Sequence, residues 1–192
     1  MRGYFGIGVE GVSKQANVGS LFRSAHAFGG SFVFTVAADY TRQRSGADTS
    51  DAVTQMPFYA YPSIGKMDLP RGCKLVGIEL VDDAIELPSF HHPLQAAYVL
   101  GRERGSLTPE MLARCDFVVK IPTKFCINLG IAGALVMYDR VISLGRFAPR
   151  PVRSGGPTEA LAEHVHGRPV FRTPERMALY RADPPATDPI DG

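Results

Sequence analysis

Residues 116–144 read DFVVKIPTKFCINLGIAGALVMYDRVISL, and this stretch decides the fold. Residues 116–121 are a short apolar run rich in valine, which predicts a buried strand. After a loop that contains Pro122, residues 128–144 are apolar and long enough for a helix. The first half of this segment is rich in small residues, namely Gly130, Ala132, Gly133 and Ala134. Small residues let another backbone come close, either in the core of one chain or in a dimer, and the sequence leaves both open.

The same alternation of strand and helix runs through the preceding part of the chain. Short apolar runs predict four more strands, at residues 4–9, 31–36, 74–80 and 97–100. A helical pattern lies between the first two strands and ends at a Gly-Gly pair, and Thr108-Pro109-Glu110 predicts another helix start. Apolar strands that alternate with helices favour an α/β fold, with a parallel sheet covered on both faces. Ligands bind such sheets at the carboxyl ends of the strands.

Composition sets further limits on the class of protein. The 192 residues include 21 basic and 19 acidic ones, so a strongly cationic nucleic-acid coat is excluded, although a local patch such as residues 41–44 (TRQR) remains open. No apolar run is long enough to span a membrane, and the N-terminus lacks the pattern of a secretory signal, so we expect a cytoplasmic protein. Three cysteines without Cys-x-x-Cys spacing indicate neither disulfides nor a metal site. We expect Cys73 and Cys115 to be buried and unreactive.

The C-terminal quarter differs from the rest, because 8 of the 15 prolines lie from residue 149 onward. We therefore expect one folded domain at residues 1–147 and a loosely ordered extension, rich in proline and arginine, at residues 148–192. A short helix is possible at residues 158–164. In the body, we expect His91-His92-Pro93 to lie on the surface.

Three loops that follow predicted strands carry glycines and polar side chains. In the first, residues 11–23, Asn17 could cap a helix whose N-terminus suits a phosphate, although an ordinary cap and a surface arginine would look the same. The second, LGRERG at residues 100–105, places a carboxylate between two glycines. The third, residues 121–130, leads to Asn128, and asparagine at a helix start is most often a cap.

In their order and spacing, these loops resemble the motifs of the SpoU–TrmH family, S-adenosylmethionine-dependent RNA methyltransferases of the SPOUT class. The motif Asn-x-Gly-x-x-x-Arg matches Asn17, Gly19 and Arg23. The motif Gly-x-Glu-x-x-Gly is close to Gly101, Glu103 and, one residue early, Gly105. The third motif, Ile-Pro followed by Ser-Leu-Asn, matches Ile121, Pro122 and Asn128, with Cys126 in place of the serine.

The resemblance implies a Rossmann-like domain with a parallel sheet and a C-terminal deep trefoil knot that binds S-adenosylmethionine. It also implies a homodimer with the site at the interface, where Arg23 would point toward the partner's cofactor. The implied catalytic residues are Arg23, Asn17, Glu103 and Asn128. The implied cofactor-binding residues are Leu80, Leu100, Gly101, Gly105, Ile121, Cys126, Asn128 and Leu129.

The reaction that the resemblance implies is 2′-O-methylation of ribose in tRNA or rRNA. Because arginine stays charged at neutral pH, we expect Arg23 to hold the phosphate beside the acceptor rather than to act as the base itself. Cys126 is a weaker hydrogen-bond donor than serine, which keeps a base or another nucleic acid open as the acceptor. A catalytically silent RNA-binding scaffold is the third interpretation.

Overall fold

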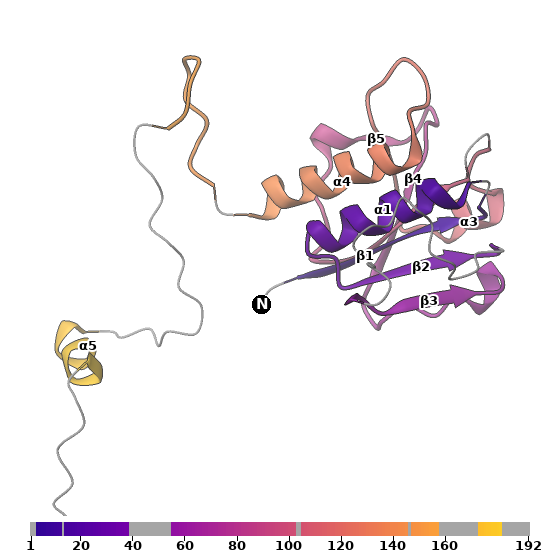
Figure 1. Cartoon of the computed structure of the whole chain (residues 1–192). Coiled ribbons are helices and arrows are strands. Elements are labelled where there is room, and N and C mark those ends of the chain that lie inside the picture. The colour runs from indigo at the N-terminus through magenta and orange to yellow at the C-terminus, as the bar shows by residue number, and fades with distance from the viewer. Residues whose placement is uncertain are drawn as a thin grey trace, which may run out of the picture. The chain divides into compact units, whose positions relative to one another are not determined.

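The structure, a computed structural model, describes residues 3–12, 14–38, 55–102, 105–145, 147–157 and 173–181. Glu103, residues 41–44 and the helix expected at residues 158–164 lie outside the described residues. The chain divides into two compact units, Met1–Arg146 and Phe147–Gly192. The first unit holds the sheet and the helices that cover it (Figure 1).

Among the described residues, seven strands form one sheet in the order β3-β2-β1-β6-β4-β7-β5. The strands are β1 (Tyr4–Glu10), β2 (Phe32–Val36), β3 (Phe58–Tyr61), β4 (Lys74–Ile78), β5 (Ile85–Glu86), β6 (Gln95–Gly101) and β7 (Phe117–Lys120). Every neighbouring pair is parallel, with Ile7 of β1 opposite Tyr98 of β6 at the centre of the sheet. The predicted parallel α/β fold is confirmed.

Two strands, β3 and β5, were not predicted. β3 lies at the edge of the sheet, where two of its four side chains are exposed, and β5 has only two residues. Neither one has the buried apolar run that marks the five predicted strands.

One face of the sheet is covered by two helices, α1 (Gln15–Ala27) and α4 (Leu129–Leu144) (Figure 1). The small residues of α4 serve this packing: a Cβ atom added to Gly133 would lie 2.1 Å from Cδ1 of Leu21 in α1. Gly130 and Ala132 are buried on the same side. Of the two roles that the sequence left open for the small residues, the structure places Gly130, Ala132 and Gly133 in the core of one chain.

The other face of the sheet packs against the helix α3 (Pro109–Arg114) and the 3₁₀ segment η1 (Ile64–Lys66). Residues of β6 alternate between the two layers, since Tyr98 belongs to the core under α1 and α4 and Val99 to the core on the α3 side. Burial on both faces explains why these strands are apolar throughout. A second 3₁₀ segment, η2 (Leu87–Ser89), leads toward β6.

The predicted helix starts have mixed outcomes. Thr108 caps α3, because its Oγ1 accepts a hydrogen bond from Met111 N at 3.2 Å. Asn128 caps α4, because its Oδ1 accepts from Gly130 N at 2.9 Å and from Ile131 N at 3.4 Å. The prediction that Asn17 caps a helix is wrong: α1 begins at Gln15, so Asn17 lies inside its first turn. A polar residue near a helix start does not by itself locate the cap.

In the second unit, the described residues contain one helix, α5 (Pro174–Arg181), which the sequence did not predict. Its start has ordinary helix-start chemistry, with Pro174 in the first helical position and Thr173 Oγ1 accepting from Arg176 N at 3.4 Å. The proline content of the surrounding residues hid this short helix.

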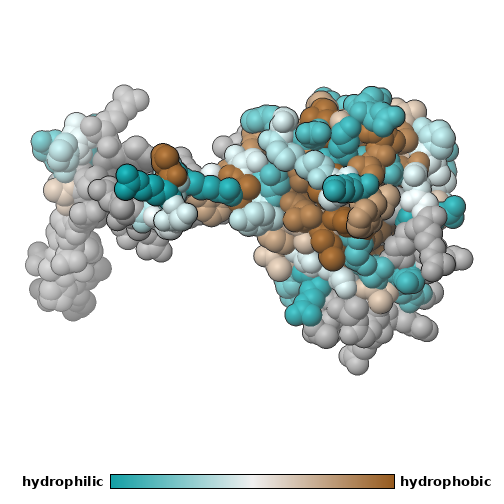
Figure 2. All heavy atoms as spheres, turned by 90° about the horizontal axis from the view of Figure 1, so that it is seen from above, coloured by the Kyte–Doolittle hydropathy of each residue, from teal (hydrophilic) through white to brown (hydrophobic). Residues whose placement is uncertain are grey.

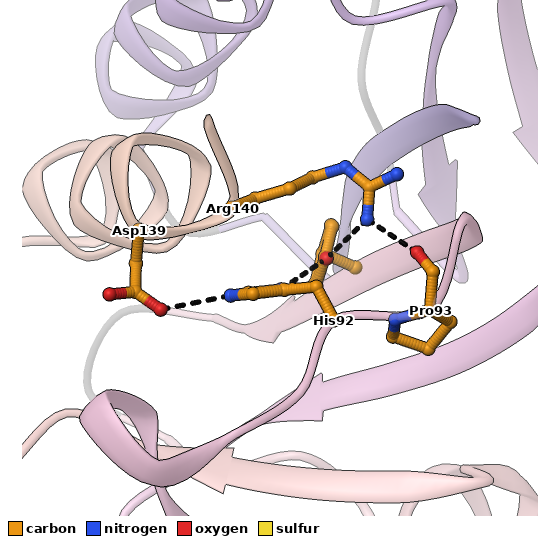
Figure 3. A network of polar contacts seen from close by, with 5 residues as sticks. His92, Pro93, Asp139 and Arg140 are labelled. Atoms are coloured by element: carbon orange, nitrogen blue, oxygen red, sulfur yellow. Dashed lines mark hydrogen bonds and ion pairs between the residues drawn. The ribbon is translucent and has the colours of Figure 1, made fainter. Parts of the chain in front are cut away.

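The prediction that His92 lies on the surface is wrong, because its side chain is buried between β6 and α4. The residue is 1% exposed, and its Nε2 lies 2.9 Å from Oδ2 of Asp139 (Figure 3). Its Nδ1 lies 2.6 Å from the hydroxyl of Tyr98. That hydroxyl accepts from Nη1 of Arg140 at 3.1 Å, so its own hydrogen is free to be donated to His92 Nδ1. These contacts fit a neutral His92 that carries its proton on Nε2 and donates it to Asp139.

Arg140, which is only 4% exposed, ties α4 to the amino ends of the central strands. Its guanidinium donates to the carbonyl oxygen of Pro93 at 2.6 Å (Figure 3). It also donates to the carbonyl oxygen of Leu94 at 2.8 Å. Burial lowers the pKa of His92, although the hydrogen bond to Asp139 acts in the opposite direction. Burial also raises the pKa of Tyr98 to about 12. This network locks the end of the sheet opposite to the one where the strands' carboxyl ends lie.

The three cysteines are free. Cys73 and Cys115 are partly buried, and burial raises the pKa of both thiols, that of Cys115 to about 11. Thiols with raised pKa values are poor nucleophiles at neutral pH, as expected for structural cysteines.

Candidate active site

A pocket of about 780 Å³ lies at the carboxyl ends of β4, β6 and β7. Apolar side chains from these strands and from α4 line its walls, namely Ile78, Leu100, Ile121, Leu129 and Ala132. Pockets of this size, with apolar walls and a few polar groups, are typical small-molecule sites. The position is the one expected for ligands of a parallel sheet.

The structure brings together all of the residues that were predicted to bind the cofactor. Leu80, Leu100, Gly101, Gly105, Ile121, Cys126, Asn128 and Leu129 all line this pocket. They come from three segments that are far apart in the sequence, at Leu80, at residues 100–105 and at residues 121–129. Asn17, which belongs to the first motif, lines the same pocket. The binding roles of these residues stay predictions.

Two other residues of the first motif lie elsewhere. Arg23 is exposed on α1 and is not among the residues that line the pocket, and Gly19 is buried within α1. If Arg23 acts on a ligand in such a pocket, it does not do so by lining the pocket of its own chain. The expectation that Arg23 serves a partner's site is compatible with this position and stays a prediction.

The loop after β6 is held by two carboxylates that were not predicted as site residues. Glu79 accepts hydrogen bonds from Leu80 N at 3.0 Å and from Leu107 N at 2.7 Å. Glu10, which is buried, accepts from Thr108 N at 2.8 Å and from Thr108 Oγ1 at 2.5 Å. Glu10 directly follows a predicted strand, and Glu79 is the last residue but one of another. Their position at strand ends is the one signal that could have marked them.

Gly101 owes its identity to a close crossing of two chain segments. A Cβ atom at this position would lie 2.8 Å from Leu107 N and 2.9 Å from the carbonyl carbon of Ser106. Only glycine allows the end of β6 and the segment at Ser106-Leu107 to approach so closely. The first glycine of the second motif is thus required by the backbone geometry of the pocket wall.

Other lining residues were not among the predicted site residues. These are Lys14, Ile78, Glu79, Arg102, Ser106, Thr123, Ile127 and Ala132. Most of them flank the three motifs directly, so their nearness to the motifs was the available signal. Among the lining residues, Lys14 and Arg102 are basic and Glu79 is acidic.

No group of three or more His, Cys, Asp or Glu side chains among the described residues could hold a metal ion. No helix in the described ranges is both long and apolar enough to cross a membrane.

The sequence matches the SpoU rRNA Methylase family over residues 5–138, and the chain therefore belongs to this family. Comparison with curated protein sequences gives no significant match.

Solved structures share the fold at low sequence identity. One is an AdoMet-bound rRNA methyltransferase from Sinorhizobium meliloti, with a TM-score of 0.68 and 18% identity, covering 75% of this chain and 58% of that one. Another is the SpoU methyltransferase AviRb from Streptomyces viridochromogenes in complex with AdoMet, with a TM-score of 0.65 and 20% identity over 74% of this chain and 61% of that one. A third concerns the 2-OH methylation of C/U34 on tRNA, with a TM-score of 0.64 and 20% identity over 74% and 91% of the two chains.

The chain spans about three fifths of the length of the first two of these relatives. At these identities the likeness shows the fold alone. The predicted trefoil knot stays a prediction.

Proposed function

We propose that the protein is an RNA methyltransferase that uses S-adenosylmethionine and methylates a ribose 2′-hydroxyl in tRNA or rRNA. Its membership of the SpoU rRNA Methylase family supports methyl transfer to RNA. Two relatives of the same fold were solved with AdoMet, and a third concerns 2-OH methylation of tRNA. The observation that carries the proposal is the convergence of three separate motif loops on one pocket.

The lining of the pocket fits S-adenosylmethionine chemically. The apolar side chains of Ile78, Leu100 and Leu129 suit the faces of an adenine ring, and the three loops that also line the pocket have backbone groups that could bind its polar atoms. Leu80, Gly101 and Ile121 would bring main-chain atoms to the cofactor. When bound, S-adenosylmethionine supplies a methyl group on a positively charged sulfur, which a nucleophilic oxygen can displace.

The remaining chemistry belongs to the side chains. A ribose 2′-hydroxyl is a weak nucleophile that must lose its proton as it attacks. Arg23 holds the phosphate beside the acceptor, and an oxygen of that phosphate takes the proton. Asn17 and Glu103 fix the geometry around this group, and Asn128 holds the third loop in place by capping α4. The walls of the pocket exclude water and keep the reacting atoms aligned.

We also propose that the protein is a homodimer. Ile131, Leu135 and Tyr138 lie three or four residues apart on α4 and are 57%, 41% and 51% exposed. Figure 2 shows apolar side chains gathered on the surface of the first unit that is seen from above. A second copy that covers this stripe would remove apolar surface from water. It would also bring another chain close to α1, which packs against α4 and carries Arg23.

Cys126 is the reason to consider a base as a second candidate acceptor of the methyl group. It lines the pocket and is exposed, at the position where the family motif has serine. A thiol donates only weak hydrogen bonds, so a contact to the ribose or the cofactor is altered, and a base becomes the alternative acceptor. We propose the cytoplasm as the compartment, since all three cysteines are free.

Transfer of labelled methyl from S-adenosylmethionine to total RNA, followed by complete digestion and nucleoside identification, tests the proposal. We expect a labelled 2′-O-methyl nucleoside and no transfer by Arg23→Ala, which should still bind the cofactor. A labelled base would show that the acceptor is a base and not a ribose hydroxyl. Full activity of the variant would overturn the role of Arg23, and absence of transfer together with absence of cofactor binding would favour a scaffold.

A further inference from the structure

The side chain of Arg102, which lines the pocket, packs against two glycines, Gly11 and Gly105. A Cβ atom at Gly11 would lie 3.4 Å from Cδ of Arg102, and one at Gly105 would lie 2.9 Å from its Nε. Gly11 has a φ of 68°, which favours glycine, and Gly105 N donates to the carbonyl oxygen of Arg102 at 3.1 Å. The stem of Arg102 therefore packs against Gly11, and its guanidinium lies beside Gly105.

This packing gives a physical reason for the altered second motif. The glycine that closes the motif stands one residue early, at Gly105, and so lies directly beside Arg102. A side chain at position 105 would displace the guanidinium from its present place. The early position of Gly105 and the presence of Arg102 are therefore linked, because the glycine leaves room for the guanidinium.

The surroundings of Arg102 favour an anion. Lys14 lines the same pocket and stands at the N-cap of α1, whose first turn has no acidic residue and no side-chain cap. The positive end of the helix dipole adds to these two charges. Glu79 also lines the pocket, but its carboxylate already accepts from two backbone N–H groups. Among the described residues, neither Lys14 nor Arg102 forms an ion pair with a carboxylate.

We propose that Arg102, supported by Lys14, binds an oxyanion of the reacting molecules. A guanidinium placed at the rim of a pocket can donate two parallel hydrogen bonds to one carboxylate or phosphate. Two sources have this chemistry: the carboxylate of the amino-acid part of S-adenosylmethionine, and a backbone phosphate of the RNA. The inference rests on the proposed function and adds a binding residue to it.

Calorimetry with two nucleosides distinguishes a cofactor carboxylate from an RNA phosphate as the source of the oxyanion. S-adenosylhomocysteine carries the carboxylate, and 5′-methylthioadenosine lacks it. If Arg102 binds the carboxylate, Arg102→Met weakens binding of S-adenosylhomocysteine about tenfold or more and leaves 5′-methylthioadenosine within about twofold. If Arg102 binds a phosphate, both nucleosides bind Arg102→Met as they bind the wild type, and KM for RNA rises. The slope of log K for RNA binding against log salt concentration then becomes shallower by about one unit.

A double-mutant cycle tests the role of Gly105 in the same assay. Gly105→Ala should reproduce part of the loss and add little in the Arg102→Met background, because both changes act on one guanidinium. Arg71→Met, at an exposed arginine just before β4, is the matched control and should behave as the wild type. Thermal melting of each variant checks folding.

Either of the two binding patterns supports the proposal. A folded Arg102→Met variant with unchanged nucleoside affinities, unchanged KM and unchanged salt dependence would overturn it, while an active wild type would leave the proposed function intact. A wild type that binds neither nucleosides nor RNA would overturn both.

Discussion

Replacing Arg140 by methionine tests whether the buried network holds α4 to the sheet. The change keeps an unbranched stem of similar length and removes the guanidinium. The carbonyl oxygens of Pro93 and Leu94, which accept at 2.6 and 2.8 Å, then lose their donor, and Tyr98 loses one at 3.1 Å. The guanidinium also lies 5.3 Å from the centre of the Phe5 ring, a favourable cation–π contact.

The size of the effect follows from these contacts. A fully buried carbonyl left without a donor costs about 1–3 kcal/mol. The carbonyls of Pro93 and Leu94 are partly buried, so the two bonds together contribute at most about 2–6 kcal/mol. Release of a buried charge returns part of that cost. We expect Arg140→Met to lower the free energy of unfolding by about 3 kcal/mol, a large share of the roughly 5–15 kcal/mol of a typical domain.

Urea unfolding of the full chain measures this loss, with Arg71→Met as the control, which should change stability by no more than about 0.5 kcal/mol. Because the network lies at the amino ends of the strands, the folded variant should bind S-adenosylmethionine as the wild type does. A loss below about 1 kcal/mol would refute the claim that the network stabilises the domain. Weakened cofactor binding by the folded variant would refute its independence from the pocket.

Three other predictions concern pH, a glycine and the dimer. Burial lowers the pKa of His92, so the unfolded chain binds the proton more readily. Stability should therefore fall as the pH drops below about 6.5 and level off below the folded pKa, and His92→Gln, which cannot titrate, should lose this dependence in urea unfolding. Gly101→Ala should lower the free energy of unfolding by about 1–3 kcal/mol, because its Cβ would lie 2.8 Å from Leu107 N, whereas the same change at Gly65, with open space around it, should cost less than about 1 kcal/mol. Leu135→Glu should give monomers in light scattering, with Ser89→Glu as an exposed control, and an unchanged mass would contradict the proposed interface.

The parts of the fold that could be predicted are those whose signal is local. The buried strands β1, β2, β4, β6 and β7 are short apolar runs, and Thr108 and Asn128 cap helices within three residues of themselves. The pocket could be predicted because its residues stand in motifs at the ends of those strands.

Other features depend on partners that are distant in the sequence. His92 is polar and lies between another histidine and a proline, yet Tyr98, Asp139 and Arg140 make its burial favourable. Glu79 and Arg102 owe their positions to Leu107 and to two glycines on separate loops. Contacts of this kind have no local pattern, so only the folded structure reveals them.

The most direct test of the account is calorimetric titration of S-adenosylmethionine into the wild type and into two tryptophan variants. Cys126→Trp would fill the pocket from an exposed position, whereas Phe125→Trp changes the neighbouring residue, which is 73% exposed and is not among the lining residues. We predict that the wild type and Phe125→Trp bind the cofactor and that Cys126→Trp does not. No binding by the wild type, or equal binding by Cys126→Trp, would contradict the assignment of this pocket as the cofactor site.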